Sequence, residues 1–151
     1  MRLGFRLKHY FFSAFREFFV HHHGSLAFRA KIFTLVIAAN DKLPLEYYKV
    51  VKDIGMNIYN GDEERSDLLM IATQELIQKC KDNNFDIDQL VYSILKELKI
   101  VPRYARKIDI KALKPLLLLS HDPDTISYQE NILEFLQNTK EEILNKSALE
   151  A

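Results

Sequence analysis

Residues 28–48 contain a helix-length run that is apolar on nearly every side, and this run constrains the fold more than any other feature. It reads Ile-Phe-Thr-Leu-Val-Ile-Ala-Ala over residues 32–39. A helix with so few polar positions is stable only when other helices surround it. Glycine and proline number only four each, which favours long helices joined by short connections. The sequence therefore predicts an all-α fold with this helix at its centre.

The length and the charge of the chain limit its class. A chain of 151 residues is long enough for one domain with its own core and too short for two. Lys plus Arg and Asp plus Glu both number 21, so no net charge points to nucleic acid. The single cysteine, Cys80, excludes an internal disulfide and fits a reducing compartment. We therefore expect a single cytoplasmic domain that does not bind nucleic acid.

Residues 1–23 are predicted to form a separate basic amphipathic helix. At roughly 100° per residue, charged and apolar side chains gather on opposite sides. The residues that define these two sides are Arg2, Arg6 and Arg16 on one and Phe11, Phe15 and Phe18 on the other. Two interpretations stay open. The phenylalanines dock on the core of the domain, or they enter the headgroup boundary of an anionic membrane while the arginines meet the lipid phosphates.

The apolar spacing of the remaining chain predicts a domain over residues 24–146, followed by a tail or linker at residues 147–151. Asn60 and Gly61 are predicted to end one helix, and Pro102 to stop another. A helix over residues 110–119 contains four consecutive leucines and is predicted to be the second fully buried helix. With a last helix after it, the sequence predicts a single-domain bundle of about seven helices.

The start of the last helix is predicted at Ser127, because Ser127 and Glu130 match a capping box. Before it, a basic cluster runs through the connection that follows Pro102. Its members are Arg103, Arg106, Lys107, Lys111 and Lys114. We favour a solvated, charge-balancing surface for this cluster, and a patch for phosphate or for an acidic partner is the alternative.

Two polar, acidic turns follow the two predicted buried helices. The candidate ligands are Asp41 and Glu46 in the first turn and Asp122, Asp124 and Glu130 in the second. If the two buried helices lie side by side as a pseudo-two-fold repeat, the turns converge, and their carboxylates match the oxygen ligands of a hard divalent cation. The alternative is that these residues cap the helices by satisfying free backbone N–H groups.

At these turns the chain resembles the TerB-like family of tellurite-resistance proteins. In that family an alanine-rich helix runs into Asp-Gly-x-hydrophobic-Ser/Thr-x-x-Glu, and a similar acidic turn recurs near the end of the domain. The matching stretches here are Ile-Ala-Ala-Asn-Asp-Lys-Leu-Pro-Leu-Glu at residues 37–46, where Asn40 stands at the family's aspartate, and residues 118–130. The resemblance implies a seven-helix fold with a pseudo-two-fold arrangement, and an acidic surface that binds metal in some members.

TerB-like domains also precede a J domain in membrane-associated DnaJ-type co-chaperones, and the order of segments here looks similar. This resemblance implies a non-enzymatic interaction or regulatory module. Its partner would be a protein or a chaperone client, near the cytoplasmic face of the inner membrane. The alternative is a stand-alone, divalent-metal-binding protein of the tellurite or stress response. No His-Pro-Asp tripeptide is present, so we expect no stimulation of a chaperone ATPase by this chain.

The membrane interpretation of the N-terminal segment gives a direct prediction. The chain should co-sediment with anionic liposomes, and the charge reversals Arg2→Glu, Arg6→Glu and Arg16→Glu together should abolish this binding because the arginines contact the anionic headgroups. Liposomes of neutral lipid are the control and should bind neither protein. Undiminished binding of the reversed variant to anionic liposomes would contradict an electrostatic anchor.

Overall fold

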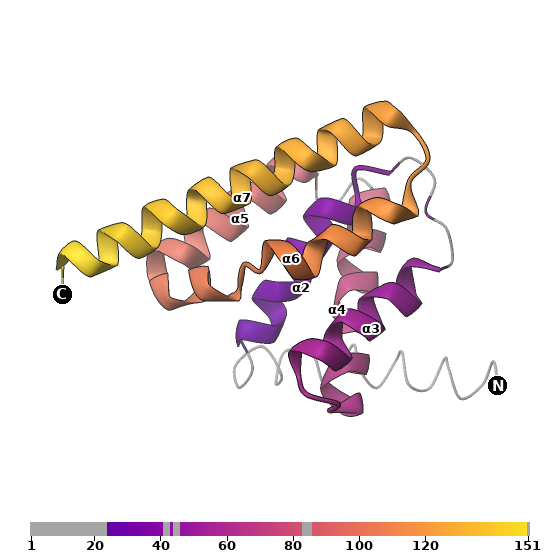
Figure 1. Cartoon of the computed structure of the whole chain (residues 1–151), viewed down its shortest axis with the longest axis horizontal. Coiled ribbons are helices and arrows are strands. Elements are labelled where there is room, and N and C mark those ends of the chain that lie inside the picture. Colours follow the sequence, from indigo (N-terminus) through magenta and orange to yellow (C-terminus); the bar gives the residue numbers. More distant parts are fainter. Residues whose placement is uncertain (1–23, 41–42, 44–45, 83–85, 151) are drawn as a thin grey trace.

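The computed structural model describes residues 24–40, 43, 46–82 and 86–150, and every regular element among them is a helix (Figure 1). The α-helices are α2 (Gly24–Ile37), α3 (Tyr47–Ile58), α4 (Glu63–Lys81), α5 (Ile87–Ile100), α6 (Ile110–Leu113) and α7 (Pro123–Glu150). Two 3₁₀-helices, η1 (Pro102–Lys107) and η2 (Lys114–Leu119), flank α6. The predicted all-α, single-domain bundle is confirmed.

Helix α2 lies in the middle of the bundle and is covered from several directions (Figure 1). It packs against α4, α5, α7, η1 and η2. Its buried residues are Leu26, Phe28, Ala30, Ile32, Phe33, Thr34, Leu35, Val36 and Ile37. These positions point to all sides of a helix, so the predicted central helix is confirmed. Thr34 meets its hydrogen-bonding need inside the helix, because its hydroxyl donates to the Ala30 carbonyl at 2.7 Å.

The two charged residues of α2 each find a partner on a neighbouring element. Lys31 Nζ lies 2.8 Å from Ser93 Oγ and 2.9 Å from Glu97 Oε2, both on α5. The guanidinium of Arg29 lies over the ring of Tyr59, 5.3 Å from the ring centroid. A partly buried cation is costly without such contacts. The two cations therefore help to set the rotation of α2 about its own axis.

Helices α3 and α4 form a hairpin that is unusually close at Gly55. A Cβ added to Gly55 would lie 3.1 Å from the Cα of Ser66 on α4, closer than side chains normally pack. The predicted turn at Asn60 and Gly61 is confirmed, since both residues have positive φ angles, 54° and 87°. Such left-handed conformations favour asparagine and glycine after a helix.

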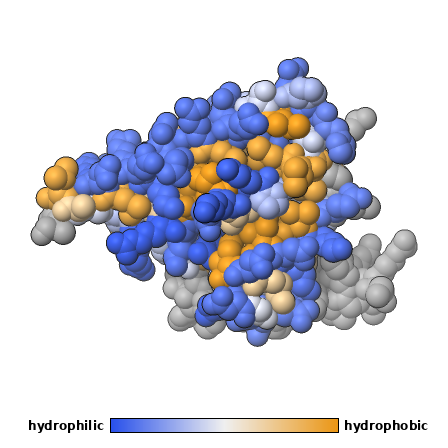
Figure 2. All heavy atoms as spheres, in the orientation of Figure 1, coloured by the Kyte–Doolittle hydropathy of each residue, from blue (hydrophilic) through white to orange (hydrophobic). Residues whose placement is uncertain are grey.

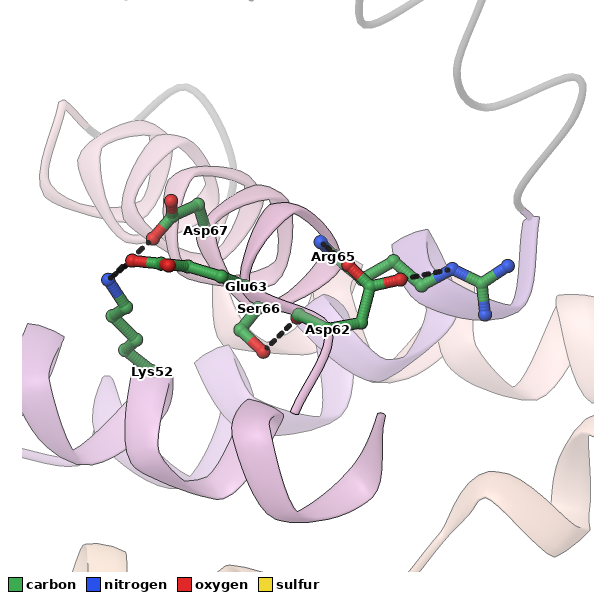
Figure 3. A network of polar contacts seen from close by, with 6 residues as sticks. All are labelled: Lys52, Asp62, Glu63, Arg65, Ser66 and Asp67. Carbon is green, nitrogen blue, oxygen red and sulfur yellow. Dashed lines mark hydrogen bonds and ion pairs between the residues drawn. The ribbon is translucent and has the colours of Figure 1, made fainter. Parts of the chain in front are cut away.

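Polar contacts hold the start of α4 against α3 (Figure 3). The Asp62 carboxylate accepts a hydrogen bond from the backbone N–H of Arg65 at 3.1 Å and so caps α4. Lys52 Nζ lies 3.1 Å from Glu63 Oε1 and 3.2 Å from Asp67 Oδ1. Solvent reaches these ion pairs and screens them, so each adds little to stability. Their main effect is to define the geometry of the hairpin.

The segment over residues 110–119 differs from the single buried helix that its leucines predict. It is split into α6 and η2. Pro115 has no backbone N–H and its ring crowds the carbonyl four residues earlier, which stops the α-helix. The 3₁₀ geometry that follows places residues three apart on one face. Leu113 and Leu116 are therefore buried, whereas Leu118 is 78% exposed.

Helix α7 begins at Pro123, so the capping box predicted at Ser127 is wrong. Asp122 Oδ2 accepts hydrogen bonds from the backbone N–H of Thr125 at 3.3 Å and from its hydroxyl at 2.7 Å. Proline at the first helical position already has a helical φ and needs no N–H partner. Asp122 and Pro123 together start the helix one turn early. The helix then continues through residues 147–150, which the sequence assigns to a tail.

Gln129 fastens α7 to the C-terminal end of α2. Its side chain is fully buried, and its Nε2 donates to the Val36 carbonyl at 2.9 Å. Val36 lies in the last turn of α2, where carbonyls have no partner within the helix. The Gln129 Oε1 atom is buried without a hydrogen-bond partner among the described residues. The described surroundings of Gln129 therefore provide an acceptor for its Nε2 and no donor for its Oε1.

We expect Gln129→Glu to lower the free energy of unfolding by about 3 kcal/mol or more near pH 8, because it buries an unpaired carboxylate. Burial raises the pKa of this new carboxyl above its value in the unfolded chain. The loss is therefore fully present above the folded-state pKa and shrinks as the pH falls towards about 4.3. Urea denaturation at several pH values measures it.

The exposed neighbour Glu130 supplies the matched control for this experiment. Glu130→Gln should leave the urea midpoint unchanged at each pH. A loss of stability in Gln129→Glu that does not vary with pH would contradict the burial of this position.

Candidate functional site

An open groove of about 860 Å³ lies between α7 on one side and the α6–η2 segment on the other. Its apolar lining consists of Ile110, Leu117, Leu118, Ile126 and Leu133. Figure 2 shows apolar residues gathered over this face of the molecule, interrupted by polar ones. A groove of this size is large enough to hold several side chains of a bound molecule.

Helix α7 forms an apolar floor and an acidic rim. Ile126, Glu130, Leu133, Glu134 and Gln137 line the groove, and their positions at i, i+4, i+7, i+8 and i+11 place them on one helix face. Leu133 is buried, while Glu130 and Glu134 are exposed. The carboxylates therefore stand at the edge, above an apolar base.

The opposite wall comes from η2 and the residues after it. Lys114, Leu117, Leu118, Ser120 and His121 line this side. Leu118 is 78% exposed, although it belongs to a run of four leucines. An exposed leucine is ordinary on its own, but one that joins other apolar side chains in a groove marks a surface for binding an apolar partner.

The predicted metal ligands have separate surroundings. Asp41 lies outside the described residues. Asp122 caps α7, Asp124 is exposed in the first turn of α7, and Glu130 stands at the rim of the groove. Glu46 is exposed just before α3. Within the described part of the chain, no group of three His, Cys, Asp or Glu side chains is arranged to hold a metal ion.

Among the described residues of the two turns, Asn40 and Asp122 act on helix ends, whereas Glu46 stands at the N-cap of α3 without a capping hydrogen bond to its side chain. Asn40, at the position of the family's aspartate, donates hydrogen bonds to the Ile37 carbonyl from its backbone N–H at 3.0 Å and from Nδ2 at 3.1 Å. Asn40 thereby closes the C-terminal end of α2, just as Asp122 closes the N-terminal end of α7. The structure therefore supports the capping interpretation for Asp122, while Asn40 satisfies a free carbonyl instead of an N–H group.

The predicted membrane-contact residues, Arg2, Arg6, Phe11, Phe15, Arg16 and Phe18, lie outside the described residues. Among the helices that are described, none is both long and apolar enough to cross a membrane. The membrane interpretation therefore stays a prediction.

Cys80 has the surroundings of an inert thiol. The residue is partly buried near the end of α4. Burial, and secondly the charge of Asp86, raise the pKa of the Cys80 thiol. A raised pKa keeps the thiol protonated near neutral pH, which disfavours a role as a nucleophile.

Among the residues that line the groove, sequence reasoning considered a binding role only for Glu130 and Lys114. It placed Glu130 in a metal site and Lys114 in a basic cluster. The apolar wall was missed because the leucine run was assigned to one buried α-helix. The available signal was Pro115, which interrupts the α-helix directly before the leucines.

These features define an all-helical domain with an open apolar groove. Comparisons with family models, curated proteins and solved structures gave no match. The TerB-like resemblance and the co-chaperone setting that it implies therefore stay predictions.

The cap on α7 predicts a pH-dependent stability. The hydrogen bonds from the side chain and the backbone of Thr125 hold the pKa of the Asp122 carboxyl below its usual range. A carboxyl with a lowered folded-state pKa stabilises the fold above its unfolded-state pKa, and this stabilisation is lost as the pH falls through the folded-state pKa. Asp122→Ala should lower the melting temperature near pH 7. The difference in melting temperature between this variant and the unaltered protein should become smaller in acid.

Asp122→Asn is the matched control, because an amide oxygen also caps a helix but does not titrate in this range. It should keep most of the stability in thermal melts followed by circular dichroism. If the asparagine and alanine variants lose the same stability, Asp122 does not act as a cap.

Proposed function

We propose that this chain is a non-enzymatic interaction module whose groove between α7 and η2 binds an apolar helical segment of a protein partner. One observation carries the proposal. Leu118 is 78% exposed at the wall of an apolar groove whose floor includes the buried Leu133. Covering such a surface removes apolar area from water, at about 25 cal/mol per Å².

The shape and charge of the groove favour an amphipathic helix as the occupant. Such a helix presents a narrow apolar stripe, at spacings of three and four residues, to a groove between two walls. Glu130 and Glu134 stand along the acidic rim on α7, and Lys114 lies on the opposite wall. A partner helix with basic residues on one flank of its stripe and an acidic residue on the other complements both walls.

The resemblance to TerB-like domains ahead of J domains supports a co-chaperone setting for this module. Incompletely folded clients expose apolar segments that are buried in their native state. Such segments have the chemistry that the groove accepts. We therefore propose a chaperone client as the partner, and a cytoplasmic location close to the inner membrane.

The proposal predicts that Leu118→Glu weakens binding of a basic amphipathic peptide with leucines at i, i+3, i+4 and i+7. We expect a loss of roughly tenfold, because burial of one leucine contributes about 1.5 kcal/mol or more. Fluorescence anisotropy of the labelled peptide measures the affinity. Since Leu118 is exposed, the substitution should leave the fold intact, which a thermal melt verifies.

Leu149→Glu is the matched control, because Leu149 is 89% exposed and does not line the groove. The affinity of the Leu149→Glu variant for the peptide should equal that of the unaltered protein. Replacing Glu130 and Glu134 by lysine should shift the preference towards a peptide with an acidic flank. Absence of peptide binding, or equal losses in Leu118→Glu and Leu149→Glu, would contradict the proposal.

A further inference from the structure

A second, smaller pocket of about 280 Å³ lies where the start of α2, the end of α3, the start of α4 and η1 come together. Its lining consists of Gly24, Ser25, Leu26, Tyr59, Arg65, Arg103, Tyr104 and Lys107. It shares no lining residue with the apolar groove. The structure thus separates the basic cluster of the sequence, since Arg103 and Lys107 line this pocket and Lys114 lines the groove.

Three of the residues that line this pocket have cationic side chains, and no lining residue has a carboxylate. Arg65 comes from α4, whereas Arg103 and Lys107 come from η1. Arg65 also forms an ion pair with Asp62, with 3.6 Å between its Nε and the Oδ2 of Asp62. Figure 3 shows the two outer nitrogens of Arg65 pointing away from Asp62. The side chains that line the pocket therefore carry a net positive charge.

Aromatic rings orient both guanidinium groups. The Arg65 guanidinium lies 5.9 Å from the centroid of the Tyr59 ring, and that of Arg103 lies 5.5 Å from the centroid of the Tyr104 ring. Stacking on a ring limits the freedom of a guanidinium in advance, so less entropy is lost when it binds a ligand. Planar, pre-oriented forks of this kind suit the paired oxygens of a phosphate group.

The tyrosines and Ser25 add neutral donors beside the cations. Burial raises the pKa of the Tyr59 hydroxyl even though Arg29 and Arg65 act in the opposite direction. The hydroxyl therefore stays protonated near neutral pH and is able to donate. The Tyr104 hydroxyl packs closely against Gly24, where a side chain would collide with it.

We propose that this pocket binds a phosphate group, either as inorganic phosphate or as a small phosphomonoester. Its volume of about 280 Å³ lies just below the usual range for ligand sites, about 300 Å³ and above, which restricts the occupant to a small molecule. Three cations and three hydroxyl groups offer more donors than the two oxygens of a carboxylate accept. The three terminal oxygens and double charge of a phosphate monoester make fuller use of them. The proposal does not depend on the function of the groove.

Isothermal titration of the full chain with inorganic phosphate, at constant ionic strength, tests this site. We expect saturable binding with one phosphate per chain. Arg103→Gln should weaken it by roughly tenfold or more, because a hydrogen bond to a charged group contributes about 1.5 kcal/mol or more. Arg106→Gln is the matched control, since Arg106 belongs to the same 3₁₀-helix, is exposed and does not line the pocket. It should bind phosphate as the unaltered protein does.

Two further measurements make the outcome specific. Arg103→Lys keeps the charge but not the planar fork, so it should fall between the unaltered protein and Arg103→Gln. Titration with glycerol phosphate identifies the ligand form: tighter binding than phosphate indicates an ester, and weaker binding indicates the free anion. Thermal melts without phosphate verify that the variants fold. No saturable binding of either compound, or equal losses in Arg103→Gln and Arg106→Gln, would overturn the proposal.

Discussion

The burial of apolar residues on all sides of α2 is the constraint on which the rest of this structure depends. A helix with apolar residues on all sides has no face to give to water, so each side needs a covering element. Helices α4, α5 and α7 and the two 3₁₀-helices provide this cover. Two polar groups of α2 are matched by partners on the surrounding helices. Lys31 meets Ser93 and Glu97, and the Val36 carbonyl meets Gln129.

The position of the groove follows from how α7 is attached. Gln129 joins α7 to the end of α2, and Lys140 Nζ donates to the Ile108 carbonyl at 2.7 Å. The α6–η2 segment lies in the chain between η1 and α7, and Pro115 shapes it. Because the 3₁₀ geometry buries Leu113 and Leu116 and leaves Leu118 exposed, the wall of the groove stays open towards α7.

The two pockets differ in the chemistry that they offer. The groove has an apolar floor, an acidic rim on α7 and Lys114 on the opposite wall. The smaller pocket has three cations, two of them stacked on tyrosine rings. An apolar helix and a phosphate group are the ligands that we propose for them. Since the two sets of lining residues do not overlap, variants in one pocket leave the other as a reference in the same protein.

The sequence by itself determined the central helix, the turn at Asn60 and Gly61, and the all-α class, because these depend on periodicity and on the backbone preferences of single residues. It did not locate the groove. Glu130 and Lys114 line the groove, but the sequence suggested a metal site for Glu130 and a basic cluster for Lys114. Tertiary structure alone decided that Leu118 is exposed and that Arg65 and Arg103 line the same pocket. Exposure depends on which neighbours cover a residue, and the shared pocket depends on how α4 and η1 both pack against α2.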